Sequence, residues 1–358
     1  MMQAAFYAPM KSPNSAVPSG DRAMARALTK ALKAQGIETE LASELQTRDR
    51  IGDLETQNRL IAQAQPEIGR MIKQGRNSGW DIWLTYHNYY KAPDLIGPEV
   101  SKALGIPYFL IESTRARKRL SGPWARFAVL AEAATDAAAA VFFLTEHDEE
   151  ALRAYGDPEQ RLVRLRPFLP RNDLPPETSR QDGILSVGMF RTGDKLASFQ
   201  LIADTLEHMR ISDWSLRIAG DGPNRPQIEA MMYKFGNRVQ LLGAQDAAQM
   251  QDLYESSSIL FWPGVNEAFG MTYLEAQASG LAVVAQNRPG VRDVLSPDGT
   301  YPSPNEGISA LANRLETLLR NPKMVSDLGK KARRYTEENH LMPRAGRTLR
   351  KTIEEVLA

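Results

Sequence analysis

The chain has 358 residues, of which 42% are hydrophobic and 24% charged, so its composition is that of a globular protein and excludes wholesale disorder. At roughly 100–200 residues per domain, this length predicts two domains, each able to bury its own core. The 44 basic and 43 acidic residues argue against a nucleic-acid binder, and the absence of cysteine excludes disulfides, thiolate metal sites and cysteine nucleophiles.

The N-terminal half alternates short apolar runs with longer amphipathic segments. No signal peptide is predicted, since no basic stretch leads into a long apolar one at the N-terminus. Helical segments are expected at 19–36 and at 55–78, the second broken near Pro66. Alternation at this spacing predicts a parallel, doubly wound sheet. Its strands are expected at 3–8, 38–43, 81–87, 107–113 and 139–145.

A proline-rich linker separates this half from a second alternating set. The stretch from Pro167 to Pro176 contains four prolines, which disfavour a helix interior or a central strand. Strands are then expected at 184–188, 214–220, 239–243, 258–264 and 281–286, and helices at about 305–320, 322–338 and 344–357.

The predicted fold is therefore α/β, with two facing Rossmann-like domains and a cleft between them. We place the first domain at 1–168, the second at 169–340, and at 341–358 a C-terminal helix that crosses back to the first domain. In such folds ligands bind at the carboxyl ends of the strands.

The densest functional signal is WPGVNEAFGMTYLEAQASGLAVVA, residues 262–285. A short loop carries Glu267, and a helix is expected to begin around 269–270, where free N–H groups and the helix dipole form a phosphate site. Glu275 follows eight residues after Glu267, about 12 Å along a helix. A bound diphosphate would then lie between two carboxylates suited to sugar and ribose diols. The alternative is a buried amphipathic helix with two solvated acids.

This stretch resembles the E-x(7)-E signature of retaining glycosyltransferases of family 4, which have the GT-B architecture of two facing Rossmann-like domains. The resemblance implies that Glu267 contacts the donor sugar and Glu275 the nucleotide ribose. It also implies that the donor diphosphate or sugar is held by the backbone of Ala268, Phe269, Gly270 and Met271.

The stretch 187–206 resembles the family in a second feature, an Arg and a Lys just after the first strand of the C-terminal domain. Arg191 and Lys195 match in order, with Arg191 three residues after Gly188. Facing two phosphates, two cations stabilise the charge that develops as the nucleotide leaves. The alternative is a solvated pair at a helix start. Where the strand 239–243 ends, the resemblance implies that the backbone at Ala244 contacts the base.

In the N-terminal half the resemblance holds only in outline. Gly20 opens the first helix, where the family has a glycine-rich loop. His87 lies among tyrosines in TYHNYYKAPD, at the end of a predicted strand, and aromatic faces with polar tips suit sugar contact. The family places a donor-contacting His after a later strand, where this chain has Glu112. His87 and Glu112 are therefore both candidates for the catalytic residue of this domain, with a purely structural His87 as the alternative.

The segment 113–127 carries five basic residues, no acid, and two aromatic residues, Trp124 and Phe127. It predicts contact with an anionic membrane surface or an anionic acceptor. An exposed helix start is the alternative.

We conclude from the sequence that the protein is a retaining, metal-independent hexosyltransferase acting on a nucleotide-diphosphate sugar and a hydroxyl acceptor. The first domain would be the acceptor side and the second the donor side. No metal and no cofactor are expected, because the histidines are far apart and no D-x-D motif occurs. We expect a cytoplasmic protein, with contact at the inner face of the membrane through 113–127. The rival hypotheses are a nucleotide-sugar epimerase of the same fold and a non-catalytic two-lobed sugar-binding protein.

Overall fold

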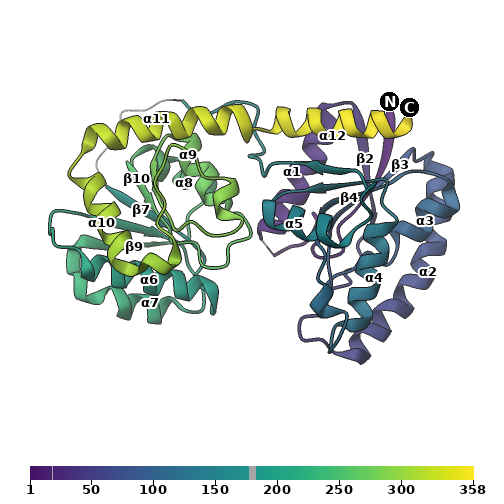
Figure 1. The fold of residues 1–358 in the computed structure, drawn as a ribbon, viewed down its shortest axis with the longest axis horizontal. Coiled ribbons are helices and arrows are strands. Elements are labelled where there is room, and N and C mark those ends of the chain that lie inside the picture. Colours follow the sequence, from purple (N-terminus) through teal and green to yellow (C-terminus); the bar gives the residue numbers. More distant parts are fainter. Residues whose placement is uncertain (18, 177–182) are drawn as a thin grey trace. The chain divides into compact units, whose positions relative to one another are not determined.

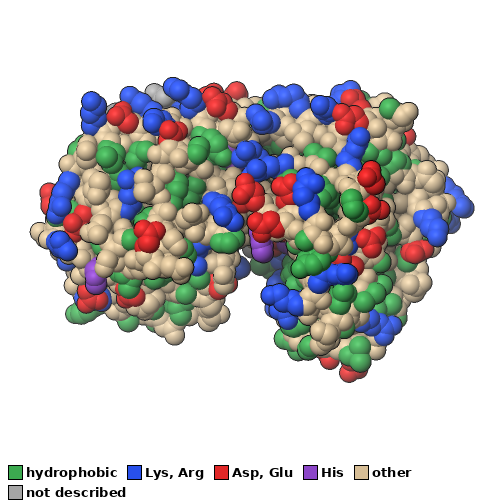
Figure 2. All heavy atoms as spheres, viewed as in Figure 1, with side chains coloured by type: hydrophobic (Ala, Val, Ile, Leu, Met, Phe, Trp, Pro, Cys, Tyr) green, Lys and Arg blue, Asp and Glu red, His purple; other side chains and the backbone are tan. Residues whose placement is uncertain are grey.

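A computed structural model describes residues 1–17, 19–176 and 183–358. The chain forms two compact units, each built on a parallel sheet flanked by helices (Figure 1). Unit 1 comprises Met1–Arg166 and Met342–Ala358, and unit 2 comprises Pro167–Leu341. The linker predicted at 167–176 thus begins at the division between the units. On the face shown in Figure 2, basic and acidic side chains are interspersed over both units.

Unit 1 contains a six-stranded sheet of order β2-β1-β3-β4-β5-β6, in which every pairing is parallel. Its strands are β1 (Met2–Tyr7), β2 (Ile37–Ser43), β3 (Ile82–Asn88), β4 (Tyr108–Ser113), β5 (Ala140–Phe143) and β6 (Leu162–Arg164). Its α-helices are α1 (Gly20–Ala34), α2 (Leu54–Ser78), α3 (Gly97–Leu104), α4 (Ala125–Asp136), α5 (Glu146–Tyr155) and α12 (Met342–Leu357).

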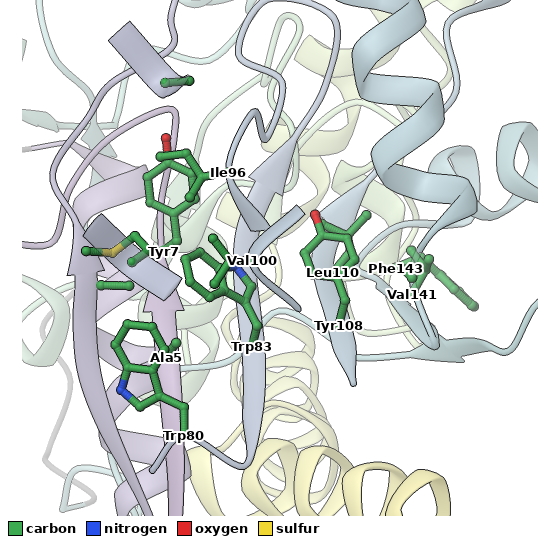
Figure 3. Packing of buried hydrophobic residues seen from close by; sticks show 14 of the residues in the cluster. Ala5, Tyr7, Trp80, Trp83, Ile96, Val100, Tyr108, Leu110, Val141 and Phe143 are labelled. Carbon is green, nitrogen blue, oxygen red and sulfur yellow. The ribbon is translucent and has the colours of Figure 1, made fainter. Parts of the chain in front are cut away.

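Aromatic residues fill the core of unit 1 on one face of this sheet (Figure 3). Trp83 on β3 packs edge-on against both Tyr7 and Trp80, with ring centroids 6.2 and 5.7 Å apart. Because helices cover both faces of a parallel sheet, its strands are apolar throughout. The five strands predicted here are all present.

Two features of unit 1 differ from the sequence-based expectation. The predicted break at Pro66 was wrong, because α2 runs unbroken from Leu54 to Ser78. Packing of its buried face, which includes Leu60, Ala64 and Met71, offsets the loss of one helical hydrogen bond at the proline. The short edge strand β6 was not predicted, since three half-buried residues between basic ones give little apolar signal.

The last helix, α12, returns to unit 1 and lies against α1 (Figure 1). Gly346 permits this close approach, because a Cβ atom there would lie 3.1 Å from the Ala31 carbonyl oxygen. At the same contact, the Arg350 guanidinium donates to the Gln35 carbonyl oxygen at 2.7 Å.

Unit 2 contains a five-stranded parallel sheet of order β11-β10-β7-β8-β9. Its strands are β7 (Ile184–Val187), β8 (Leu216–Ala219), β9 (Val239–Gly243), β10 (Ile259–Phe261) and β11 (Ala282–Val284). Its α-helices are α6 (Asp194–His208), α7 (Arg225–Met232), α8 (Ala247–Glu255), α9 (Met271–Ala278), α10 (Gly307–Leu319) and α11 (Pro322–Asn339).

Each sheet has one point where its strand order reverses. In unit 1 this switch point lies between β1 and β3, and in unit 2 between β7 and β10. The loops that leave two such strands diverge to opposite faces of the sheet and open a crevice between them, where ligands of this fold class bind. The switch points are therefore the places to look for functional side chains.

Candidate functional sites at the two switch points

The switch point of unit 2 brings together Lys195 and Glu267. Lys195 lies in the first turn of α6, just after β7, and its ammonium pairs with the Glu267 carboxylate from the loop after β10. The Trp262 indole Nε1 donates to the same carboxylate at 2.9 Å, and the Lys195 Nζ lies 5.2 Å from the Trp262 ring. The side chains of Lys195 and Glu267 are only 27% and 15% exposed. Lysine, carboxylate and indole thus form one preorganised cluster.

The same loop leaves the start of α9 open. Gly270, with a φ of 81°, precedes the helix, and no side chain caps it and no acid occupies its first turn. Its first N–H groups and the positive end of its dipole are available to an anion. The loop is tightly backed, because a Cβ atom on Gly290 would lie 1.8 Å from the Ala268 carbonyl oxygen. This geometry suits a phosphate.

Glu275 lies on α9, and Glu267 lies in the loop before this helix, as predicted. The helix begins at Met271, one or two residues later than expected. The Glu275 carboxylate accepts a hydrogen bond from the Tyr254 hydroxyl at 2.7 Å. Burial raises the pKa of Glu275 above its ordinary value, and the bond from Tyr254 only partly opposes this. The two acids therefore have separate partners and different environments.

Arg191 lies in the exposed loop between β7 and α6. Its guanidinium forms no ion pair with any of the described residues, whereas Lys195, four residues later, pairs with Glu267. Glycine keeps this loop close to the sheet, since a Cβ atom on Gly188 would lie 2.6 Å from the Trp262 ring.

The remaining donor-side residues follow the strand ends. Ala268 is exposed and Phe269 is buried, and Met271 is the first residue of α9. Ala244 follows β9 at the edge of the sheet, away from the switch point, so it is separated from the cluster by β8.

The switch point of unit 1 is built differently. His87 at the end of β3 lies with its Nδ1 3.4 Å from the Asp21 carboxylate and 4.0 Å from that of Glu112 at the end of β4. His87 and Glu112 both have left-handed backbones, with φ of 70° and 60°. Such conformations are costly outside glycine and gather at functional sites.

The charges at this point shift the pKa values of their neighbours. Burial alone would lower the pKa of His87, but Glu112 and Asp21 outweigh it and raise that pKa above its ordinary value. Burial raises the pKa of Glu112, with Asp148 contributing, and burial likewise raises that of Asp148. For Asp21, interactions with His87 outweigh the effect of burial and lower the pKa. The imidazole of His87 thus interacts electrostatically with three carboxyl groups, those of Asp21, Glu112 and Asp148.

Sequence reasoning missed Asp21, Asp148 and Trp262. Asp21 and Asp148 lie in the first turns of α1 and α5, where acids commonly occur because they stabilise a helix dipole. Gly20, the predicted contact, is exposed and has open space around it. The residue of this segment that lies beside His87 is Asp21, directly after Gly20.

Within the part of the chain that the structure describes, no group of three or more histidine, aspartate or glutamate side chains is arranged to hold a metal ion. None of the described helices combines the length and the apolar character needed to span a membrane.

Part of the chain is similar in sequence to known glycosyl transferases. Residues 177–335 match the family model described as glycosyl transferases group 1. The chain is similar to the sulfoquinovosyl transferase of Arabidopsis thaliana, 27% identical over 160 residues, and to a phosphatidylinositol N-acetylglucosaminyltransferase subunit of Schizosaccharomyces pombe, 38% identical over 80 residues. The matches cover 43% and 22% of this chain but only 30% and 18% of those relatives. The chain thus spans less than a third of the length of these two relatives.

Two solved structures share the fold over almost the whole chain. Sucrose-phosphate synthase from Thermosynechococcus elongatus is similar with a TM-score of 0.73 at 17% identity, covering 100% of this chain and 99% of that one. The Anabaena protein HepE, solved in complex with UDP, gives 0.69 at 15% identity, covering 99% and 100%. The fold is GT-B, with the two Rossmann-like domains predicted.

Proposed function

We propose that this protein is a retaining glycosyltransferase of family 4 that moves a hexose from a nucleotide-diphosphate sugar to an acceptor hydroxyl without a metal ion. The observation that carries the proposal is the pairing of Lys195 with Glu267 beside the open start of α9. A cation and free N–H groups suit a diphosphate, and a largely buried carboxylate suits the hydroxyls of the attached sugar. The group 1 match of residues 177–335 supports the same conclusion.

On the donor side, we assign each residue of the cluster one role. Lys195 exchanges its contact with Glu267 for the diphosphate, assisted by Arg191 from the exposed loop. Glu267, released from Lys195 but still bonded to Trp262, accepts from the hexose hydroxyls. Glu275 accepts from the ribose diol in exchange for its present bond from Tyr254.

The transfer itself is a substitution on one face of the sugar. The bond from the anomeric carbon to the diphosphate oxygen breaks, and a bond from that carbon to the acceptor oxygen forms on the same side. The departing diphosphate oxygen takes the acceptor proton. Lys195, Arg191 and the N–H groups of α9 stabilise the charge that builds up on the diphosphate.

On the acceptor side, we place the switch point of unit 1. His87, with its pKa raised and its Nδ1 facing Asp21 and Glu112, presents its other ring nitrogen as a hydrogen-bond donor to a hydroxyl. Glu112 acts through His87, as a positioning residue. The two left-handed backbones fix both side chains in this arrangement.

The test is to incubate the purified chain with the uridine, guanosine and adenosine diphosphate sugars. A transferase releases nucleoside diphosphate from one of them and, given a hydroxyl acceptor, forms a glycoside with the anomeric configuration of the donor, as read by NMR. An epimerised sugar nucleotide without acceptor would identify the rival epimerase. Binding without release of nucleotide or formation of product would identify a sugar-binding protein.

A further inference from the structure

A second cluster of functional groups lies in unit 1, outside both switch points. Lys91 and Arg119 pack against the same two aromatic rings, those of Tyr90 and Trp124. The Lys91 Nζ lies 5.7 Å from the Tyr90 centroid and 5.3 Å from that of Trp124, and the Arg119 Cζ lies 5.1 and 5.3 Å from them. We call these four residues the cation cage.

The cage has donors but no acceptor. Neither Lys91 nor Arg119 forms an ion pair with any of the described residues. The Trp124 indole Nε1 is buried and, among the described side chains and backbone, has no hydrogen-bond partner. Two like charges on shared rings repel each other, and a buried N–H without an acceptor destabilises the folded state. An anion that accepts hydrogen bonds would relieve both costs.

Not every cation of this basic segment belongs to the cage. In the same basic segment, Arg115 is buried and pairs with Glu132 and Asp136, each at 2.6 Å. Arg115 therefore belongs to the core of unit 1, whereas Arg119 has no carboxylate partner among the described residues and packs on the cage rings instead.

The start of α4 adds to the positive character of the cage. This 12-residue helix begins directly after Trp124, with no side-chain cap and no acid in its first turn. Its dipole therefore favours an anion beside Trp124. The turn is rigidly backed, since a Cβ atom on Gly52 would lie 2.4 Å from the Pro123 side chain and the Asp49 N–H donates to the Lys91 carbonyl oxygen at 2.8 Å.

A row of aromatic rings connects the cage to His87. The His87 ring lies 4.9 Å from that of Tyr89, Tyr89 lies 5.3 Å from Tyr90, and Tyr90 lies 5.7 Å from Trp124. A molecule with an anionic group in the cage would therefore lie over ring faces that suit sugar or polyol carbons.

We propose that the cation cage binds a phosphate ester group of the acceptor and thereby holds a hydroxyl of the same molecule near His87. The acceptor role rests on the function proposed above, whereas the phosphate site stands on the cage alone. The same phosphate chemistry occurs in soluble sugar or polyol phosphates and in the headgroups of anionic lipids. The predicted membrane contact through 113–127 is then one of two sources of a single ligand type.

The experiment measures binding to the full chain by tryptophan fluorescence and calorimetry. One arm uses glycerol phosphate, and the other uses phosphatidylcholine vesicles with and without phosphatidylglycerol. A hydrogen bond to a charged group contributes about 1.5–3 kcal/mol, so Arg119→Gln and Lys91→Gln should each weaken binding about tenfold or more. Trp124→Phe keeps the ring but removes the N–H, and should weaken binding severalfold.

The matched control is Lys118→Gln, an exposed cation from the same short helical turn as Arg119 that contacts neither cage ring. It should change the affinity less than twofold. Circular dichroism of every variant checks its fold, and Trp124→Phe tests the cage again if a charge variant is unstable.

The outcomes separate the hypotheses. Losses in the glycerol phosphate arm identify a soluble acceptor, and losses only in the anionic vesicle arm identify a lipid headgroup. Equal losses for Lys118→Gln and Arg119→Gln would show a diffuse basic surface and overturn the cage, as would no binding in either arm. Nucleoside diphosphate binding, a property of unit 2, should be unchanged in all these variants. A chain that binds phosphate esters but releases no nucleotide would overturn the proposed function and leave the cage standing.

Discussion

At the switch point of unit 2, one lysine meets one glutamate beside a helix start that no side chain caps. At the switch point of unit 1, one histidine lies among three carboxyl groups, and the nearest helix is capped by Ser19 and carries Asp21 in its first turn. Two sheets of the same type thus place different charges at equivalent positions, a lysine balanced by one glutamate in unit 2 and an excess of carboxyl groups in unit 1.

The proposed assignment of ligands rests on this difference. A diphosphate is repelled by a cluster with several carboxyl groups and attracted by a lysine and free N–H groups, so we propose that it binds to unit 2. Neutral hydroxyl groups suit the carboxylates and imidazole of unit 1. An anionic part of the acceptor would have to lie away from the switch point of unit 1, where the cation cage is found.

The largest effect is expected from the lysine of unit 2. Lys195→Ala should lower turnover by about 10²–10³-fold, as for the loss of one preorganised charge stabiliser. The control is Lys234→Ala, which removes the cation of another lysine–glutamate pair in the same unit, with Glu207. Turnover by Lys195→Ala within threefold of the wild type would remove Lys195 from the site.

Substitutions of the two acids of unit 2 should affect the binding of different ligands. Glu275→Gln weakens a charge-assisted bond to the ribose and should reduce the affinity for nucleoside diphosphate about tenfold. Glu267→Gln should leave that affinity nearly unchanged and impair only the intact sugar donor and turnover. Calorimetry with both ligands distinguishes the roles, and equal losses everywhere would mean that the acids serve only the fold.

In unit 1 the corresponding test is how the free energy of unfolding depends on pH. Because the pKa of His87 is raised in the folded protein, its charge stabilises the fold fully below its ordinary value of about 6.5, and this contribution is lost as pH rises through the raised pKa. His87→Gln should therefore cost more free energy of unfolding at pH 5.5 than at pH 9. Urea unfolding measures this, with the exposed His208→Gln as control. A cost that is independent of pH would contradict the arrangement.

The smallest effect is expected from metal removal. With phosphate charge met by lysine, arginine and backbone N–H groups, excess EDTA should leave transfer within experimental error of the untreated enzyme. Loss of activity that magnesium or manganese restores would show that the diphosphate site has been misread.

Much of the fold was predictable because strands of a parallel sheet are continuous apolar runs. Local rules failed where packing decides, as at Pro66 inside α2 and at the short edge strand β6. In unit 2 the candidate residues Arg191, Lys195 and Glu267 could be chosen from the sequence, because they closely follow two neighbouring strands, β7 and β10. The hydrogen bond that joins Glu275 to Tyr254 was not predicted, because Tyr254 comes from the separate helix α8.

In unit 1 the site was harder to predict, because its members come from four separate elements. Asp21 and Asp148 resemble ordinary first-turn acids, and only the sheet order brings them to His87 and Glu112. The left-handed backbones of His87 and Glu112 leave no mark on the sequence. The cation cage was visible only as a basic segment, since Lys91 comes from another loop.

The most direct test of the central claim is a calorimetric titration of nucleoside diphosphates into the wild-type chain, Lys195→Ala and His87→Gln. At 100 times its dissociation constant, the preferred nucleotide should add about 2.7 kcal/mol to the free energy of unfolding, which supplies a second readout. The account predicts that Lys195→Ala weakens this binding about tenfold, and that His87→Gln leaves it unchanged. Unchanged affinity in Lys195→Ala, or a loss confined to His87→Gln, would contradict the assignment of the diphosphate to unit 2.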